Sequence, residues 1–267
     1  MDIGYCWDTG LLRQINEDSV CTVSFDLKTH LGTVSAGLFA VADGMGGHNA
    51  GEIASDLAIR MLQATCISGL LSKSPEPPLK ILEVAFKKAN LAILEAAAEK
   101  SLEGMGTTLT AAVVIGQDLF IAHIGDSRCY VINSRETLQI TKDHSVVQQL
   151  VDAGIITAVQ ARSHPRKNEI TRVLGFSGDS EPDLLKVKLY AGDNLLLCSD
   201  GLCAVMPDDI IAEAVLHAQN ASQACADLTA RVNLEGGPDN ISVIVVKPDN
   251  LPSWQAMATA QTSVRVK

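Results

Sequence analysis

Hydrophobic positions recur along the chain with a helical period in some segments and with a strand-like pattern in others. Apolar side chains three or four positions apart predict helices over residues 52–66 and, roughly, 79–100. Between them, prolines at positions 75, 77 and 78 predict a loop, because proline cannot continue a helix. Two further amphipathic segments, at about 208–218 and 221–233, predict a second pair of helices.

Strand-like segments come in groups between these helical pairs. Short runs rich in β-branched residues and bounded by turn residues predict an antiparallel meander over 107–116, 118–127, 128–134 and 137–141. The strand pattern returns at 194–200 and at 241–247. Strands in groups and helices in pairs favour an α+β fold, layered around antiparallel sheets, over a doubly wound parallel sheet.

The composition narrows the class of protein. A chain of 267 residues suits one large domain or two small ones. Its net charge of −10 argues against nonspecific nucleic-acid binding and against an anionic membrane surface, since both partners are themselves negative. No apolar run reaches the roughly 18 residues that span a bilayer.

Two further features of the sequence bear on the cellular compartment of the protein. The N-terminus has an acid at residue 2 and no basic segment, so it is not expected to be a signal peptide. The seven cysteines are scattered without a C-x-x-C pair, which indicates a reducing compartment. We therefore expect a cytoplasmic location.

Acidic residues stand repeatedly where an apolar run meets a turn. They are Asp43, Asp126 and Asp200 after such a run, Asp239 just before one, and Glu17 and Asp18 at the start of another. A single Asp is an ordinary turn residue, but carboxylates that meet at several strand ends would repel one another without cations. Mg²⁺ and Mn²⁺ suit such oxygen ligands, whereas zinc would need a His and Cys cluster that the sequence lacks.

The glycine-rich turn after Asp43 does not match a nucleotide-binding loop. The G-x-x-x-x-G-K-[ST] motif is absent, and Asn49 stands where G-x-G-x-x-G needs its third glycine. Asp43 would also repel a pyrophosphate. A G-x-S-x-G elbow is absent as well. A phosphate site that begins with an acid is therefore best explained by a bound metal.

Eight motifs, in a fixed order, give the chain a resemblance to a known family. They are DTGLLRQINEDS, VADGMGGHNAGEIAS, GTTLT, IGDSRCYVI, TKDHS, HPRKNEITRVLG, LLLCSDGL and GGPDNISVIVV. Over about residues 1–247 the chain resembles the bacterial metal-dependent protein Ser/Thr phosphatases of the PPM (PP2C) family. The resemblance implies a catalytic domain over 1–247, a mobile flap within it at about 145–180, and a C-terminal tail at 248–267.

The resemblance also implies an architecture and a reaction. The expected fold is a four-layer α/β/β/α sandwich, with two central antiparallel sheets flanked by helix pairs. The expected activity is hydrolysis of phosphoserine and phosphothreonine by a hydroxide that bridges two Mn²⁺ or Mg²⁺ ions, with a third ion beside them. The expected partners are phosphorylated proteins and a cognate Ser/Thr kinase, and the chain is expected to be a monomer.

Site roles follow from the matched motifs. The resemblance implies that Asp43 bridges both metals, that the Gly44 carbonyl binds the second, and that Asp200 and Asp239 hold the first. Glu17 would act near the second metal.

Further roles follow in the same way. Asp126, with Asp200, would hold the third metal. Arg13 matches the phosphate-binding arginine, and its guanidinium suits two phosphoryl oxygens at once. His48 matches the proposed general acid for the leaving serine oxygen. In the flap, His164 and Arg166 are candidate substrate contacts.

Several residues and two other functions stay open at this point. Asp18 fits either a supporting role or a turn cap, and Asn240 either orients Asp239 or caps its turn. His144 is expected to order the start of the flap, and His123 to be a core histidine. The same motifs would also serve a hydrolase of a small phosphorylated molecule, because metals recognise phosphate and not protein. A pseudophosphatase binding module would lack ligands, and every expected acid is present.

Overall fold

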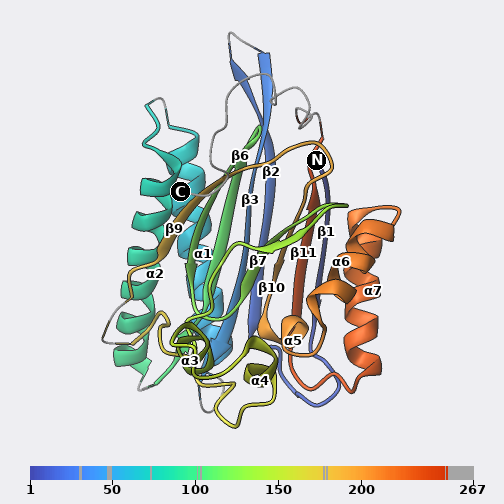
Figure 1. Cartoon of the computed structure of the whole chain (residues 1–267). Coiled ribbons are helices and arrows are strands. Elements are labelled where there is room, and N and C mark those ends of the chain that lie inside the picture. The colour runs from blue at the N-terminus through green and yellow to red at the C-terminus, as the bar shows by residue number, and fades with distance from the viewer. Residues whose placement is uncertain are drawn as a thin grey trace.

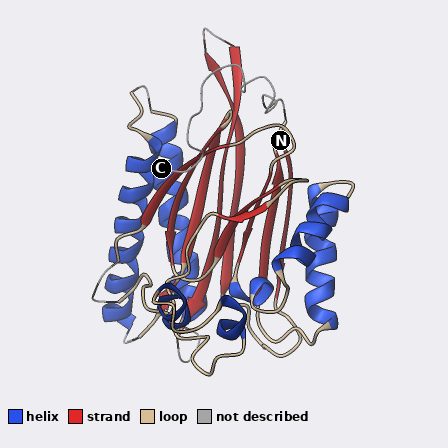
Figure 2. Cartoon of the chain, viewed as in Figure 1, coloured by secondary structure: helices blue, strands red, loops and turns tan. Residues whose placement is uncertain are grey.

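Two antiparallel sheets lie face to face in the middle of the molecule, and helices cover their outer faces (Figures 1 and 2). The computed structural model describes residues 1–29, 32–46, 50–72, 74–100, 102, 104–176, 178, 180–249 and 251. His48, Asn49 and most of the predicted tail at 248–267 lie outside the described residues. The α+β sandwich expected from the sequence is confirmed.

One sheet of the described chain contains five strands. In spatial order they are β1 (Asp2–Asp8), β11 (Ile241–Lys247), β10 (Asn194–Cys198), β7 (Arg128–Ile132) and β8 (Thr137–Gln139). Helices α6 (Asp208–His217) and α7 (Ala221–Leu234), with the short α5 (Asp200–Cys203), pack on its outer face.

The other sheet is built on a long hairpin. Its strands follow the order β2 (Asp18–Thr29), β3 (Gly32–Met45), β5 (Leu109–Ile115), β6 (Asp118–Ile124) and β9 (Asp183–Lys188), and β4 (Gly106–Thr107) pairs with the end of β3. Helices α1 (Gly51–Leu70) and α2 (Pro78–Lys100) cover it. Both helices match the segments that the apolar period predicted.

Alternation along β3 shows how the core is divided and how it positions the site. Leu38 and Ala40 face α1 and α2, whereas Phe39 and Val41 face the opposite sheet. Because side chains alternate along a strand, Asp43 is in phase with Phe39 and Val41 and continues the inter-sheet row at its end. The apolar layer between the sheets therefore ends in a carboxylate.

The segment between β8 and β9 forms a lobe at the same end of the sandwich as the turns that carry these acids. It contains the short helices α3 (Val146–Asp152) and α4 (Ala158–Arg162), drawn at the bottom of Figure 1. Ser145 caps α3 and Thr157 caps α4 through a capping box. We call residues 145–180 the flap, the range that the sequence predicted. Within the described part of the chain, no helix is both long and apolar enough to cross a membrane.

Candidate functional site

Two of the acids meet through strand pairing. Asp18 begins β2 and stands directly opposite Asp43 in the β2–β3 register. Opposite residues of an antiparallel pair have Cβ atoms about 5 Å apart, and like charges there destabilise the sheet. The sequence thus places two carboxylates side by side at the strand ends, at a cost that a cation would remove.

The backbone around Asp43 is fixed by Thr107, at the end of β4, and by Thr108, which follows it. The Asp43 N–H donates to Thr108 Oγ1 at 2.9 Å, and its carbonyl accepts from the Thr108 N–H and from Thr107 Oγ1, both at 2.9 Å. The side chain retains partial exposure to solvent. The threonines of the GTTLT motif therefore aim Asp43 into the space between the sheets.

Crowded negative charge perturbs the carboxyl groups of this site. Burial raises the pKa of Asp43 well above its ordinary value, and Asp18, Asp200 and Asp126 push it further in the same direction. Asp200, the first residue of α5, has its pKa raised by burial and by Asp239. Acids so far apart in sequence affect one another only because the fold brings them together.

Asp18 and Asp126 are the most buried members, at 2% and 7% exposure. Burial raises the pKa of Asp18 to about 7, and nearby hydroxyls of Ser242 and Ser199 oppose that shift. Burial and Asp200 raise the pKa of Asp126 as well. Asp18 Oδ2 and Asp126 Oδ1 are buried without a hydrogen-bond partner in the described structure, although buried polar atoms are normally paired.

Glu17 lies against the first turn of α1. The Gly51 N–H donates to its carboxylate, and a Cβ on Gly51 would clash with Glu17 Oε1. A Cβ on Gly44 would likewise clash with the Gly51 and Glu17 carbonyls. Close backbone approach therefore requires glycine at position 44, and the absence of a side chain at Gly51 leaves room for the Glu17 carboxylate. This acid lies at a helix N-terminus, where negative charge is stabilised.

Arg13 stands at the edge of this acidic group. Its Nη2 donates to Asp239 Oδ2 at 2.9 Å, and its Nη1 lies 4.0 Å from Glu17 Oε2. The Arg13 side chain remains 48% exposed, so the guanidinium faces solvent as well as the acids. This placement fits a residue that meets an anion arriving from outside.

Asn240 holds the loop that carries Arg13. Its Nδ2 donates to the carbonyls of Thr9 and Ile15, both at 3.0 Å, and its Oδ1 accepts the Glu17 N–H at 2.8 Å. The Leu11 N–H adds a bond to the Gly237 carbonyl at 2.8 Å. Asn240 is buried, so it fixes the position of the loop from within.

The structure therefore brings together most of the predicted site residues. Asp43, Asp126, Asp200, Asp239, Glu17 and Arg13 gather at one end of the sandwich, with Gly44 among them. His48 lies outside the described residues. In the flap, Arg166 pairs with Glu169 at 2.8 and 2.7 Å, and His164 Nδ1 accepts the Arg166 N–H.

The sequence left open the roles of two residues that the structure places at the site, Asp18 and Asn240. For Asp18, the available signal was the strand alternation, because Asp18 is in phase with Val20, which packs against the layer between the sheets. For Asn240 no local signal exists, since its partners Thr9, Ile15 and Glu17 lie more than 220 positions away in the sequence.

The carboxylate oxygens of the site suit hard divalent cations, although they do not yet converge on a single metal position. Among the residues described, no three His, Cys, Asp or Glu side chains form a ready-made metal cage. The buried, unpaired oxygens of Asp18 and Asp126, and the mutual repulsion of four or more carboxylates, nevertheless fit cations that retain several waters. The residues present therefore fit Mg²⁺ or Mn²⁺, with side-chain rotation needed to complete the coordination.

Comparisons of the sequence with protein families and with individual proteins both find protein phosphatases. A family model described as protein phosphatase 2C matches residues 15–241. The chain is 37% identical over 243 residues to serine/threonine phosphatase stp of Listeria monocytogenes, covering 91% of this chain and 94% of that protein. It is 42% identical over 240 residues to PstP of Mycobacterium tuberculosis, covering 89% of this chain but only 43% of that longer protein.

The fold of the chain is also similar to that of a solved structure. The catalytic domain of the serine/threonine protein phosphatase PstP, in complex with two manganese ions, superposes with a TM-score of 0.77. The two share 39% sequence identity, and the match covers 91% of this chain and 96% of that one.

Proposed function

The chain belongs to the protein phosphatase 2C family, and we propose that it is a metal-dependent phosphatase that hydrolyses phosphoserine and phosphothreonine in proteins. The observation that carries this proposal is the group of mutually repelling carboxylates, bordered by Arg13, at the end of the inter-sheet layer. The two relatives from Listeria monocytogenes and Mycobacterium tuberculosis are named serine/threonine phosphatases, which supports the same substrate class.

We propose that the acids divide the binding of the cations. Asp43 would bridge two Mn²⁺ or Mg²⁺ ions, with Asp200 and Asp239 on the first and the Gly44 carbonyl and Glu17 on the second. Asp126, together with Asp200, would hold a third. When bound, these ions would supply charge neutralisation for the phosphoryl group and a more acidic water for attack on it.

The chain's own side chains have separate tasks. Arg13 would exchange its contact with Asp239 for two phosphoryl oxygens, to which the planar guanidinium can donate in parallel. Asn240 would keep the Arg13 loop in register with the acids. His48 remains our proposed donor of the proton that the leaving serine or threonine oxygen needs.

The cellular setting is also part of the proposal. We propose a cytoplasmic monomer that opposes a Ser/Thr protein kinase, with residues 1–247 as the catalytic domain and 248–267 as a tail.

The proposed activity is tested with purified protein. We expect release of phosphate from p-nitrophenyl phosphate and from phosphothreonine peptides, loss of both activities in EDTA, and recovery with Mn²⁺. Hydrolysis of small phosphorylated metabolites, but of no phosphopeptide, would contradict the protein substrate class. Full activity in EDTA would contradict the metal dependence.

A further inference from the structure

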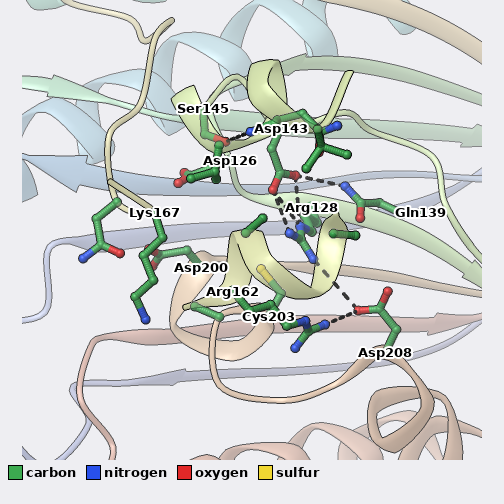
Figure 3. Close-up of a pocket in the computed structure, with 17 residues that line it drawn as sticks. Asp126, Arg128, Gln139, Asp143, Ser145, Arg162, Lys167, Asp200, Cys203 and Asp208 are labelled. Carbon is green, nitrogen blue, oxygen red and sulfur yellow. Dashed lines mark hydrogen bonds and ion pairs between the residues drawn. The ribbon is translucent and has the colours of Figure 1, made fainter. Parts of the chain in front are cut away.

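A pocket of about 190 Å³ opens between the flap and α5, next to the acidic site. Asp126 and Asp200 form part of its wall, so the pocket and the site are continuous (Figure 3). The flap contributes α3, α4 and the segment that follows them. A substrate whose phosphoryl group lies at the acids would therefore have room for a neighbouring side chain here.

Part of the pocket lining is small or apolar. Val147, Val151, Ala158, Ala161 and Ala204 contribute side chains that carry no hydrogen-bonding group. Gln148 and Asn168 add neutral amides. These residues allow a side chain to enter without selecting its charge, so charge selection depends on the ionised residues of the wall.

Two acidic residues of the pocket lining, Asp143 and Asp208, are already paired with arginines. Asp143 accepts three hydrogen bonds from Arg128, at 2.7 to 3.1 Å, and one from Gln139 at 2.9 Å. Asp208 lies 3.4 Å from Arg162 and 3.9 Å from Arg128. The arginines therefore balance Asp143 and Asp208.

Lys167 differs from these residues. It lines the pocket and is exposed, and within the described residues its ammonium group has no ion pair. In Figure 3 it lies on the side away from the Arg128–Asp143 and Arg162–Asp208 pairs. Once cations occupy the acidic site, Lys167 leaves the pocket with an unbalanced positive charge.

We propose that this pocket is a substrate subsite that selects an acidic side chain close to the phosphorylated residue, with Lys167 as its specificity-determining charge. The inference rests on the proposed phosphatase function. An aspartate or glutamate would place its stem against the apolar lining and its carboxylate at Lys167. Arg166, one position away, is held by Glu169 and does not line the pocket.

The test is a charge exchange between enzyme and substrate. A phosphothreonine peptide with alanine elsewhere receives one glutamate or one lysine, in turn, at each of the three positions on either side. With wild-type protein and Mn²⁺, at least one position should favour glutamate over lysine by about two- to fivefold in kcat/KM, the size expected for an exposed ion pair. Lys167→Glu should reverse that ratio at the same position.

A matched control separates this effect from net charge. Lys88→Glu changes the same charge on the exposed face of α2, away from the pocket, and should keep the wild-type ratio. Equal kcat/KM for all peptides, or a ratio that Lys167→Glu leaves unchanged, would overturn the subsite while the phosphatase function stands. Release of phosphate from no peptide by the wild type would reject the proposed function and the subsite with it.

Discussion

Individual residues at this site are arranged for binding cations at the expense of stability. Asp18 and Asp43 stand opposite each other on two strands, and neither forms an ion pair with a basic side chain among the described residues. Like charges at such positions destabilise a sheet. Sites that bind tightly to a ligand commonly retain this kind of local conflict in the free protein.

A first prediction concerns Asp43→Asn in metal-free protein. Removing one of several mutually repelling carboxylates should raise the melting temperature in EDTA, by roughly 2–4 °C for each kcal/mol of relieved repulsion. Thermal unfolding followed by circular dichroism measures this. Asp56→Asn, on the exposed face of α1, provides the control and should have little effect. A melting temperature for Asp43→Asn below that of the wild type would contradict the repulsion.

A second prediction concerns Asn240→Ala. The substitution removes three hydrogen bonds that hold the Arg13 loop, so we expect KM for a phosphopeptide to rise about tenfold and stability to fall by about 2 kcal/mol. Asn133→Ala removes three hydrogen bonds of a buried asparagine elsewhere in the fold. It should lose similar stability with an unchanged KM, and an equal rise in KM for both variants would refute the positioning role.

At the scale of elements, much of the fold followed from the sequence and part of it did not. The helices at 51–70 and 78–100 and the meander were predicted because each has a clear period. The edge strand β9 and the one-turn helix α5 were not predicted. β9 carries lysines among its leucines and gains its identity from pairing with β6, which no local pattern records.

The site shows the same division. Acids at strand ends, and the metal that they imply, were readable from the sequence, and the resemblance supplied the roles. The pocket wall was not readable, because Arg162 and Lys167 reach it only through the folding of α4 and the segment after it. The predicted flap contacts, His164 and Arg166, stay a prediction; the structure shows that neither lines the pocket.

The root of the flap is joined to the strand that leads to Asp126. His144 and Gly125 exchange two bonds: the His144 N–H donates to the Gly125 carbonyl at 2.7 Å, and the Gly125 N–H donates to His144 Nδ1 at 3.1 Å. The His144 ring packs against that of His123, with centroids 4.9 Å apart. His123 is buried between Thr110 and the Lys142 carbonyl, as the sequence indicated.

A third prediction follows from this histidine. Burial and His144 lower the pKa of His123 to about 3, against about 6.5 in the unfolded chain. Between those values the unfolded chain binds a proton that the folded protein does not, so acidification favours unfolding. From pH 7 to pH 5 the wild type should lose about 2 kcal/mol more stability than His123→Gln. Denaturant unfolding at both pH values measures the difference, and parallel losses in the two proteins would contradict it.

In the molecule as a whole, the two packed sheets hold the candidate site at one end of the sandwich. The inter-sheet layer is apolar along its length and changes to carboxylates where the strands terminate. Carboxylates from the ends of both sheets and from the turns between them meet there. Under the proposed function, bound metal ions would therefore link the two halves of the sandwich. Global stability should therefore depend on the cations.

A fourth prediction tests this dependence. Mn²⁺ at about 100 times its dissociation constant should add about 2.7 kcal/mol for each site, which corresponds to a rise in melting temperature of roughly 5–10 °C. EDTA should reverse the rise, and Asp200→Asn should reduce it. An identical melting temperature with and without Mn²⁺ would show that the carboxylates do not bind it.

The most direct measurement of the central claim is the rate of phosphate release from a phosphothreonine peptide at saturating Mn²⁺, compared between the wild type and Asp43→Asn. If the carboxylates at the end of the inter-sheet layer form the catalytic centre, the wild type turns over and EDTA stops it. Asp43→Asn, although folded, should then be slower by about a thousandfold or more. A folded Asp43→Asn variant that releases phosphate at the wild-type rate would contradict the account.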